Sequence, residues 1–356
     1  MLSKEKTIAD VSSWANISDD LLRLIATLTR SPQHHSRMTA VCRSWRASLA
    51  DQKINFPAVC LMLRNNGDYH RFYSISGEIF DELDLLEFRG WDCFGSPFGW
   101  LVTSDWDCEI QLFNPFSRAS FPLPKNNSPM VKLILSINPE EPNSNCIVFA
   151  IYDGRRHIGF AKPGDLAWRA LIYDDDGGFG GGIFIWDDVI YFKCNFYGCL
   201  NSGVIVLFED LHGAHPESVK FASRPPNFHG GHTCYLFDLD GNLCMTEYID
   251  YRIEFVIFKL DMDTKSWEKI YSLGDRSLFL GNCCTFTVAA ADYPGCKPSC
   301  IYYTDELTDV EVNGIYEVEK YLDKDIGLGS LVQPFPKSEL MEDFFPPLCW
   351  IIPYPL

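Results

Sequence analysis

The stretch VIFKLDMDTKSWEKIYSL (Val256–Leu273) has the layout that decides the fold. An apolar run leads into a polar turn, and a bulky residue, Trp267, opens the return run. The stretches IQLFNPFSRASFPL (Ile110–Leu123) and IGFAKPGDLAWRALIY (Ile158–Tyr173) share this layout. Short apolar or alternating runs bounded by Gly, Pro, Asn and Asp are typical of β-hairpins. The sequence therefore predicts a repeated β-hairpin unit.

The bulky residues of these stretches set the length of the repeat. Phe121 and Trp168 are 47 positions apart, and Trp267 follows Trp168 after 99 positions, close to two such steps. Steps of the same length reach three further β-like stretches, around Phe72, Val219 and Tyr316. Six units of roughly 50 residues have the spacing of a kelch-like array.

Residues 57–356 are therefore expected to form a β-propeller with six blades. So many short strands, without a convincing long helix, exceed one ordinary sandwich but suit a radial repeat. The last apolar run, LCWIIP (348–353), is expected to pair with PAVCLML (57–63). That pairing would close the ring and remove a free sheet edge.

The first fifty residues have helical periodicity instead. Leu21, Leu22, Ile25 and Leu28 fall on one helical face, and Ser18 is a suitable N-cap. The pattern restarts after Ser31 and Pro32. Its apolar stripe consists of Met38, Val41, Cys42 and Trp45, and Leu49 extends it. Periodicity alone leaves open whether these helices pack on the rest of the chain or bind another protein.

Charge separates the same two regions. Residues 1–55 carry a net charge of +3 and the remainder carries −21. An acidic body argues against nucleic acid as a partner, because binding phosphates requires a basic surface. The 14 cysteines and the polar start of the chain predict reduced thiols in the cytoplasm or nucleus, and no apolar run is long enough for a membrane span.

The N-terminal region resembles the F-box, a module of three helices. WANISDDLLRLIATL (14–28) and RMTAVCRSWRASLAD (37–51) carry the two halves of the family pattern in order. The matching residues are Ile17, Asp20, Leu21, Leu22, Ile25, Arg37, Val41, Cys42, Arg43, Trp45 and Arg46. The sequence departs from the pattern at Ser18, where the family has proline, and at His34 and His35.

The resemblance implies an adaptor-binding surface. Known F-boxes bind the Skp-type adaptor of SCF (Skp–cullin–F-box) ubiquitin ligases, and through it a cullin–RING ligase. The residues expected to contact the adaptor are Ile17, Leu21, Leu22, Ile25, Leu28, Val41, Cys42, Trp45 and Arg46. Because Ser18 stands where the family has proline, this sequence lacks the Leu-Pro edge with which other F-boxes contact the adaptor.

Residues 57–356 resemble the kelch-like (KIB-type) propeller that follows the F-box in a large plant family. The phrases that carry this resemblance are GSPFGWLV, LFNPFSR…LP, VIFKLD…W, SLGDRSLFLG, CIYYTDE, GIYEV and FFPPLCWIIP. The expected organisation is a disordered tail over residues 1–13, an F-box over 14–52 and the propeller over 57–356. The implied function is a substrate receptor of an SCF ligase with an unknown client protein, and the alternative is a binding module outside any ligase.

Three other patterns could indicate a metal-binding, protein-binding or phosphate-binding site. HGGHTC (229–234) and HGAH (212–215) could supply zinc ligands, although no Cys-x-x-Cys pair accompanies them. The acidic clusters DWDCE (105–109) and YTDELTDVE (303–311) suit solvated turns or, alternatively, an acidic face that recognises a basic client segment. DDDGGFGGG (174–182) lacks the Gly-Lys-Ser/Thr of a phosphate loop. We therefore expect no catalytic residues, no cofactor and no metal.

Overall fold

A computed structural model describes most of the chain, which divides into two compact units. One unit is Met1–Pro57 with Pro353–Leu356, and the other is Ala58–Ile352. The described residues are 14, 17–29, 32–49, 59–65, 69–75, 79–84, 92–105, 107–115, 117–142, 144–173, 184–249, 254–281, 285–305, 312–318 and 344–352. The tail expected over residues 1–13 and the glycine-rich stretch 174–182 lie outside them.

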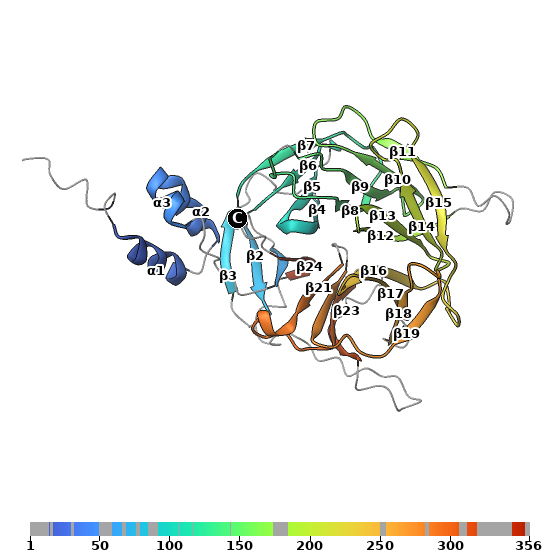
Figure 1. The fold of residues 1–356 in the computed structure, drawn as a ribbon. Helices are drawn as coiled ribbons and strands as arrows, with labels where there is room; N and C mark the ends of the chain where they lie inside the picture. The colour runs from blue at the N-terminus through green and yellow to red at the C-terminus, as the bar shows by residue number, and fades with distance from the viewer. Residues whose placement is uncertain are drawn as a thin grey trace, which may run out of the picture. The chain divides into compact units, whose positions relative to one another are not determined.

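The smaller unit contains three short helices (Figure 1): α1 (Asp19–Thr29), α2 (Pro32–Val41) and α3 (Arg43–Leu49). Its core consists of Leu22, Ala26 and Leu49, against which Ile17, Met38 and Trp45 pack. A core of this size buries little apolar area, so such a unit gains little stability from it.

The larger unit is a β-propeller, whose described residues form six four-stranded sheets arranged around a centre (Figure 1). One sheet combines the last strand of the unit, β24 (Phe344–Ile351), with the first three, β1 (Cys60–Asn65), β2 (Tyr69–Ser74) and β3 (Ile79–Asp84). The next sheet holds β4 (Asp92–Gly95), β5 (Leu101–Ser104), β6 (Ile110–Phe113) and β7 (Ser120–Leu123). The next two hold β8 (Met130–Leu135), β9 (Val148–Tyr152), β10 (His157–Ala161) and β11 (Arg169–Leu171), and β12 (Trp186–Phe192), β13 (Asn195–Leu200), β14 (Ile205–Glu209) and β15 (Glu217–Ala222). The last two hold β16 (Thr233–Leu239), β17 (Asn242–Ile249), β18 (Glu254–Leu260) and β19 (Trp267–Ile270), and β20 (Arg276–Leu280), β21 (Phe286–Ala289), β22 (Cys300–Asp305) and β23 (Val312–Glu317).

Five of the six sheets have the order of a regular blade, and one does not. In those five, each strand pairs antiparallel with its neighbour along the sheet. The sheet of β20–β23 has the order β21-β20-β22-β23, and β20 pairs with β22 in parallel. The expectation of six blades is corrected to five regular blades and one rearranged sheet. Hairpin periodicity predicts that strands exist, but it does not decide on which side of β20 the next strand adds.

The expected closure of the ring is confirmed. β24 pairs antiparallel with β1, and Leu61 lies opposite Trp350. Cys349, Trp350 and Ile351 are buried with Leu61 and Met62 in one core cluster. The C-terminal strand thus completes the first blade and covers the edge that β1 would otherwise expose.

The repeat of bulky residues marks the outermost strand in most blades. Phe121, Val219, Trp267 and Tyr316 lie in β7, β15, β19 and β23, and Trp168 directly precedes β11. Phe72 falls in β2, one strand further inward, so the repeat is out of step in the first blade.

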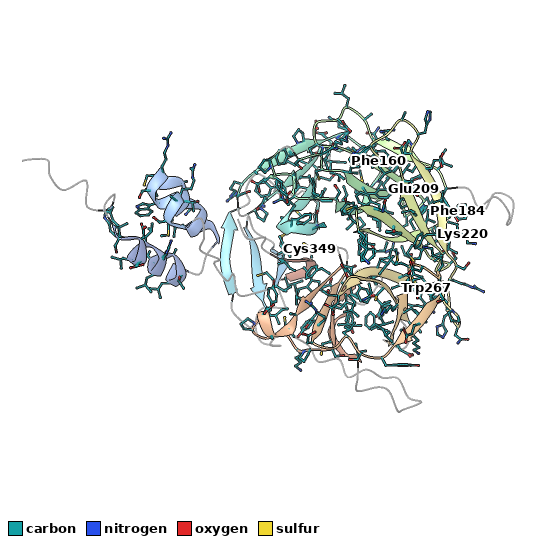
Figure 2. All side chains as sticks on the ribbon, viewed as in Figure 1. Phe160, Phe184, Glu209, Lys220, Trp267 and Cys349 are labelled. Carbon is teal, nitrogen blue, oxygen red and sulfur yellow. The ribbon has the colours of Figure 1, made fainter. Side chains whose placement is uncertain are left out.

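The two tryptophans of this repeat, Trp168 and Trp267, make the same contact between blades. The Trp168 indole donates to the carbonyl of Pro124 at 2.8 Å, and the Trp267 indole (labelled in Figure 2) donates to the carbonyl of Ser223 at 2.6 Å. Pro124 and Ser223 each follow the outermost strand of the preceding blade. The repeated tryptophan therefore satisfies a backbone carbonyl where one blade leads into the next.

Candidate functional site

The smaller unit leaves one side of α1 apolar and exposed. Leu21, Leu24 and Leu28 are 49%, 53% and 70% exposed and recur at the spacing of one helical face. The opposite side supplies Leu22 and Ala26, each 1% exposed, to the core. We call Leu21, Leu24 and Leu28 the apolar face of α1. With two apolar sides, α1 carries more apolar surface than the small unit buries.

The residues expected to bind an adaptor divide between the core and the surface. Leu22 is in the core, and Ile17, Ile25, Cys42 and Trp45 are half-buried. Leu21, Leu28, Val41 and Arg46 are exposed. Leu24 was missed by the sequence reasoning, although its i+3 spacing from Leu21 was a readable signal. The side chains of His34 and His35 are outside the described residues.

Cys42 interrupts the apolar stripe expected across the second half of this unit. It lies between α2 and α3, and its thiol accepts the backbone N–H of Trp45 at 3.5 Å. The break changes the helical phase, so Met38 and Trp45 pack on the core while Val41 is exposed. The expectation of one stripe from Met38 to Trp45 is therefore corrected, and Cys42 caps a helix.

Polar contacts hold α1 against α3. The Ser18 hydroxyl accepts the Leu21 N–H at 3.4 Å, as expected of an N-cap. Ser48 donates to Asp19 at 2.5 Å, and the Arg23 side chain donates to the Ser48 carbonyl at 2.9 Å. These bonds fix the helix whose apolar face is exposed.

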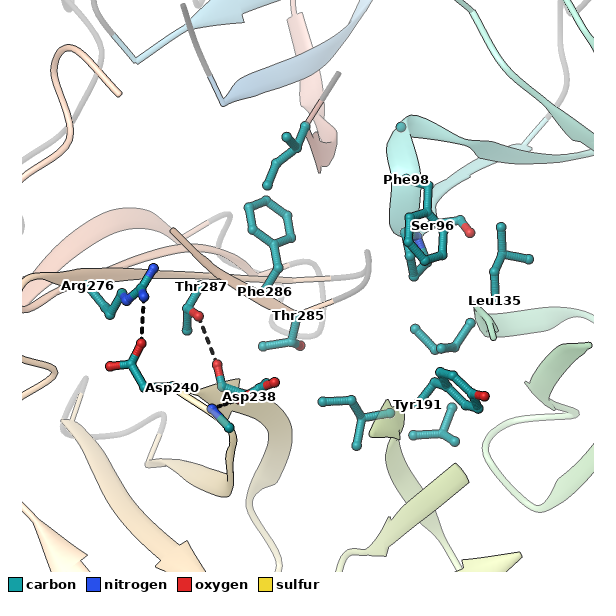
Figure 3. Close-up of a pocket in the computed structure, with 17 residues that line it drawn as sticks. Ser96, Phe98, Leu135, Tyr191, Asp238, Asp240, Arg276, Thr285, Phe286 and Thr287 are labelled. Carbon is teal, nitrogen blue, oxygen red and sulfur yellow. Dashed lines mark hydrogen bonds and ion pairs between the residues drawn. The ribbon is translucent and has the colours of Figure 1, made fainter. Parts of the chain in front are cut away.

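The propeller has a cavity of about 440 Å³ near its centre (Figure 3). Its lining comes from the turn after β4, from the ends of β8, β12 and β16, from the start of β20 and β21, and from Ile352 after β24. Phe98, Tyr191 and Phe286 give it aromatic walls. The cavity thus collects side chains that lie far apart in the sequence.

Charged groups lie on one side of this cavity. Asp238 lies near the end of β16, and Asp240 belongs to the turn between β16 and β17, where Asp240 and Gly241 have φ of 51° and 77°. Two consecutive residues with positive φ are typical of a type I′ hairpin, and Asp-Gly is a preferred pair there. Arg276 pairs with Asp240 at 2.6 Å, and Asp238 accepts the Gly241 N–H at 2.7 Å (Figure 3). These residues were not predicted from the sequence, although Asp-Gly at the end of an apolar strand is a readable turn signal.

A buried ion pair lies next to the cavity. Lys132 of β8 pairs with Asp188 of β12, and both side chains are almost fully buried. Asp188 also accepts the backbone N–H groups of Val189 and Leu236, each at 2.7 Å. The cavity-lining Thr285 donates to Asp188 at 3.4 Å. Because buried charges need partners, this pair joins strands of neighbouring blades in a defined register.

The neighbouring Asp187 has a perturbed acidity. Burial raises the pKa of Asp187 to about 6, while Arg155 at 3.2 Å and the Cys234 N–H at 3.1 Å act in the opposite direction. Desolvation opposes ionisation more strongly than one partly exposed arginine favours it. Asp187 contacts Arg155 and Cys234 of neighbouring blades and is not one of the residues that line the cavity.

The two histidine motifs have separate partners. His229 lies 3.1 Å from the buried Glu247, which also accepts the N–H of Gly230 at 2.9 Å. His212 contacts Asn145 at 3.1 Å. Within the described part of the chain, no three His, Cys, Asp or Glu side chains form a group that could hold a metal ion. Glu247 instead holds the loop that contains HGGH against β17.

The first acidic cluster is a turn, as one of its two readings expected. Asp105 accepts the backbone N–H groups of Asp107 and Glu109, and Glu109 pairs with Lys125 at 2.6 Å. Residues 306–311 of the second cluster lie outside the described residues.

Residues 72–318 match the family described as the KIB1-4 β-propeller. This match covers more than half of the chain and extends over strands from all six sheets. The chain belongs to the KIB1-4 β-propeller family.

Relatives of this KIB1-4 propeller protein include F-box proteins of Arabidopsis thaliana. F-box protein At2g05970 is 23% identical over 82% of this chain and 84% of its own length. Putative F-box protein At4g17565 is 24% identical over 96% and 95%, and F-box protein SKIP23 is 23% identical over 95% and 95%. The resemblance to plant F-box proteins with a C-terminal propeller is thereby confirmed.

Buried thiols of the KIB1-4 propeller are poorly suited to nucleophilic chemistry. Burial raises the pKa of Cys60 and of Cys244 to about 12, so both thiols stay protonated at neutral pH. No helix among the described residues has the length and apolar character needed to cross a membrane.

Proposed function

We propose that this protein is the substrate-recognition subunit of an SCF ubiquitin ligase. Its helical unit would bind a Skp-type adaptor, and its propeller would bind a client protein in the cytoplasm or nucleus. The F-box names of relatives that cover the helices as well as the propeller support this role. The observation that carries it is the apolar face of α1, which the small unit leaves uncovered.

The proposed contribution to ubiquitination is proximity and not chemistry. A receptor that holds a client near a ubiquitin-charged enzyme makes their reaction effectively intramolecular, which raises the effective concentration. Such a role requires two independent binding surfaces on one chain. The division into a helical unit and a propeller is consistent with that requirement.

Binding to a purified Skp-type adaptor tests this proposal. We expect the full chain to bind, and we expect the double variant Leu21→Glu/Leu28→Glu to bind at least tenfold more weakly, because it places charge on the apolar face of α1. Leu166→Glu is the matched control, since Leu166 is fully exposed in the propeller.

A Ser18→Pro variant, which restores the proline of the F-box pattern, separates weak binding from none. If the folded native chain and the folded Ser18→Pro variant both fail to bind the adaptor, the receptor role is wrong. The protein would then be a propeller binding module outside any SCF ligase.

A further inference from the structure

We propose that the central cavity binds a basic side chain, arginine or lysine, in an exposed segment of a client protein. This inference rests on the proposed function and specifies the chemistry of the client. It depends on four features of the described residues: the size of the cavity, its charge, its aromatic walls and the buried hydroxyl of Ser96.

The cavity has the dimensions of a site for an inserted side chain. Its volume of about 440 Å³ lies in the range of roughly 300–1,000 Å³ that is usual for binding pockets. Its lining residues come from several blades, all at the end of the propeller where β8, β12 and β16 end. A side chain inserted here would contact residues that several blades hold in place.

The charges around the cavity favour a cation. Asp238 and Asp240 are both exposed, so an incoming group can reach their carboxylates. The lining also includes a cation, Arg276, but Asp240 pairs with it at 2.6 Å and Asp275 lies 3.9 Å from its Nε. Arg276 is therefore paired with Asp240 through a terminal nitrogen, although its Nε has no hydrogen-bond partner among the described residues, and the charge of Asp238 remains. The net charge of −21 outside residues 1–55 attracts basic segments over a longer range.

The walls suit the rest of an arginine or lysine side chain. Phe98, Tyr191 and Phe286 lie on the cavity wall, where aromatic faces attract a cation and cover its aliphatic stem (Figure 3). Phe98 has φ of 63° and ψ of 26°, a left-handed conformation that is unfavourable for a bulky residue. The fold therefore maintains this aromatic ring at the wall despite a local cost.

Ser96 is an independent sign of a ligand. Ser96 is one of the lining residues and is 3% exposed, and its buried hydroxyl has no hydrogen-bond partner among the described residues. A buried hydroxyl without a partner lowers the stability of a fold, because its desolvation is not compensated by a hydrogen bond. A guanidinium or ammonium group donates hydrogen bonds, and a small rotation of the Ser96 side chain lets its hydroxyl accept one.

Five pools of immobilised heptapeptides test this chemistry. Each pool has random flanking residues and one fixed central residue: Arg, Lys, Glu, Gln or Leu. We expect the full chain to bind the Arg and Lys pools at least fivefold better than the Glu and Gln pools. Asp238→Asn should reduce that ratio at least threefold. It removes only the charge, because asparagine can still accept the Gly241 N–H.

Asp263→Asn is the matched control, because Asp263 is exposed in the turn between β18 and β19 and its loss changes the net charge equally. Ser96→Ala should weaken binding to the Arg and Lys pools about threefold without lowering the free energy of unfolding, since its hydroxyl makes no bond in the free protein. The inference is wrong if the Glu pool binds as well as the Arg pool, if no pool binds, or if Asp238→Asn and Asp263→Asn have the same effect. Adaptor binding, measured on the same preparations, reports separately on the proposed function.

Discussion

At the scale of single residues, buried acids join the blades of this propeller. Asp187 and Asp188 are consecutive in β12, where the pairing with β13 shifts register between Trp186 and Asp188. Asp188 binds Lys132 and the Leu236 N–H, while Asp187 binds Arg155 and the Cys234 N–H. Both acids thus accept backbone N–H groups from β16 of the next blade. In the sequence Asp187 and Asp188 simply follow Trp186, and nothing in that pattern indicates these contacts.

Asp187 is expected to make stability depend on pH. Its pKa is about 6 in the folded protein against 3.8 for an ordinary aspartate. Between these values the folded chain keeps a proton that the unfolded chain has lost, so rising pH through this window destabilises the fold. Asp187→Asn cannot titrate. Its free energy of unfolding, relative to the native protein, should therefore rise from pH 4 to pH 7 by up to about 3 kcal/mol.

Urea unfolding at pH 4, 5, 6 and 7 measures this difference. Asp263→Asn provides the control, because Asp263 is exposed and should show no such trend. A constant difference between Asp187→Asn and the native protein across this range would contradict the assignment.

At the scale of elements, the repeated tryptophan explains why the period could be read from the sequence. Trp168 and Trp267 occupy equivalent places at the start of an outermost strand and bind equivalent carbonyls. Equal contacts require equal spacing, so the repeat appears in the residue pattern. The same reasoning explains the N-terminal helices, whose apolar spacing is local. The apolar spacing does not continue through Cys42, because this residue caps α3 and the helical phase changes there.

Removing the indole N–H of Trp267 should weaken the propeller. Trp267→Phe keeps a ring near Phe258, which lies 6.5 Å away in an edge-on arrangement, but leaves the carbonyl of Ser223 without its donor. We expect a loss of about 1 kcal/mol in the free energy of unfolding, measured by urea denaturation followed by circular dichroism. Trp168→Phe should have a similar effect, whereas Trp14→Phe, in the exposed part of the helical unit, should have none. Equal stability of all three variants would rule out this role.

At the scale of the whole molecule, closure by the C-terminal strand makes the ring cooperative. β24 joins β1 across nearly the full length of the propeller sequence, and Trp350 is 1% exposed within the shared core. Its ring stacks edge-on against Phe279 at 5.2 Å, so this strand also touches the rearranged sheet. The final strand thus connects two blades that the chain order leaves apart.

A truncated protein without residues 344–356 should therefore lose most of its stability. It leaves the β1 edge unpaired and exposes the pocket of Trp350, and an exposed edge promotes aggregation. We expect aggregates in size-exclusion chromatography and loss of the cooperative thermal transition. Removal of residues 353–356 alone keeps β24 and should change neither. A soluble monomer with a native-like transition in the longer truncation would show that closure is dispensable.

The apolar pattern by itself determined the elements that depend on neighbours in the chain: the hairpins, their period of roughly 50 residues, the N-terminal helices and the closing strand. Specific sequence motifs, and not the apolar pattern, carried the family resemblance that the comparison confirmed. Only the tertiary structure decided the order of β20–β23, the exposed side of α1 and the cavity. Ser96, Asp238 and Arg276 are brought to one cavity by different blades, and no local period relates their positions. Local spacing encodes strands and helices because their geometry repeats within a few residues, whereas a site at the centre of a ring depends on how the blades are packed together.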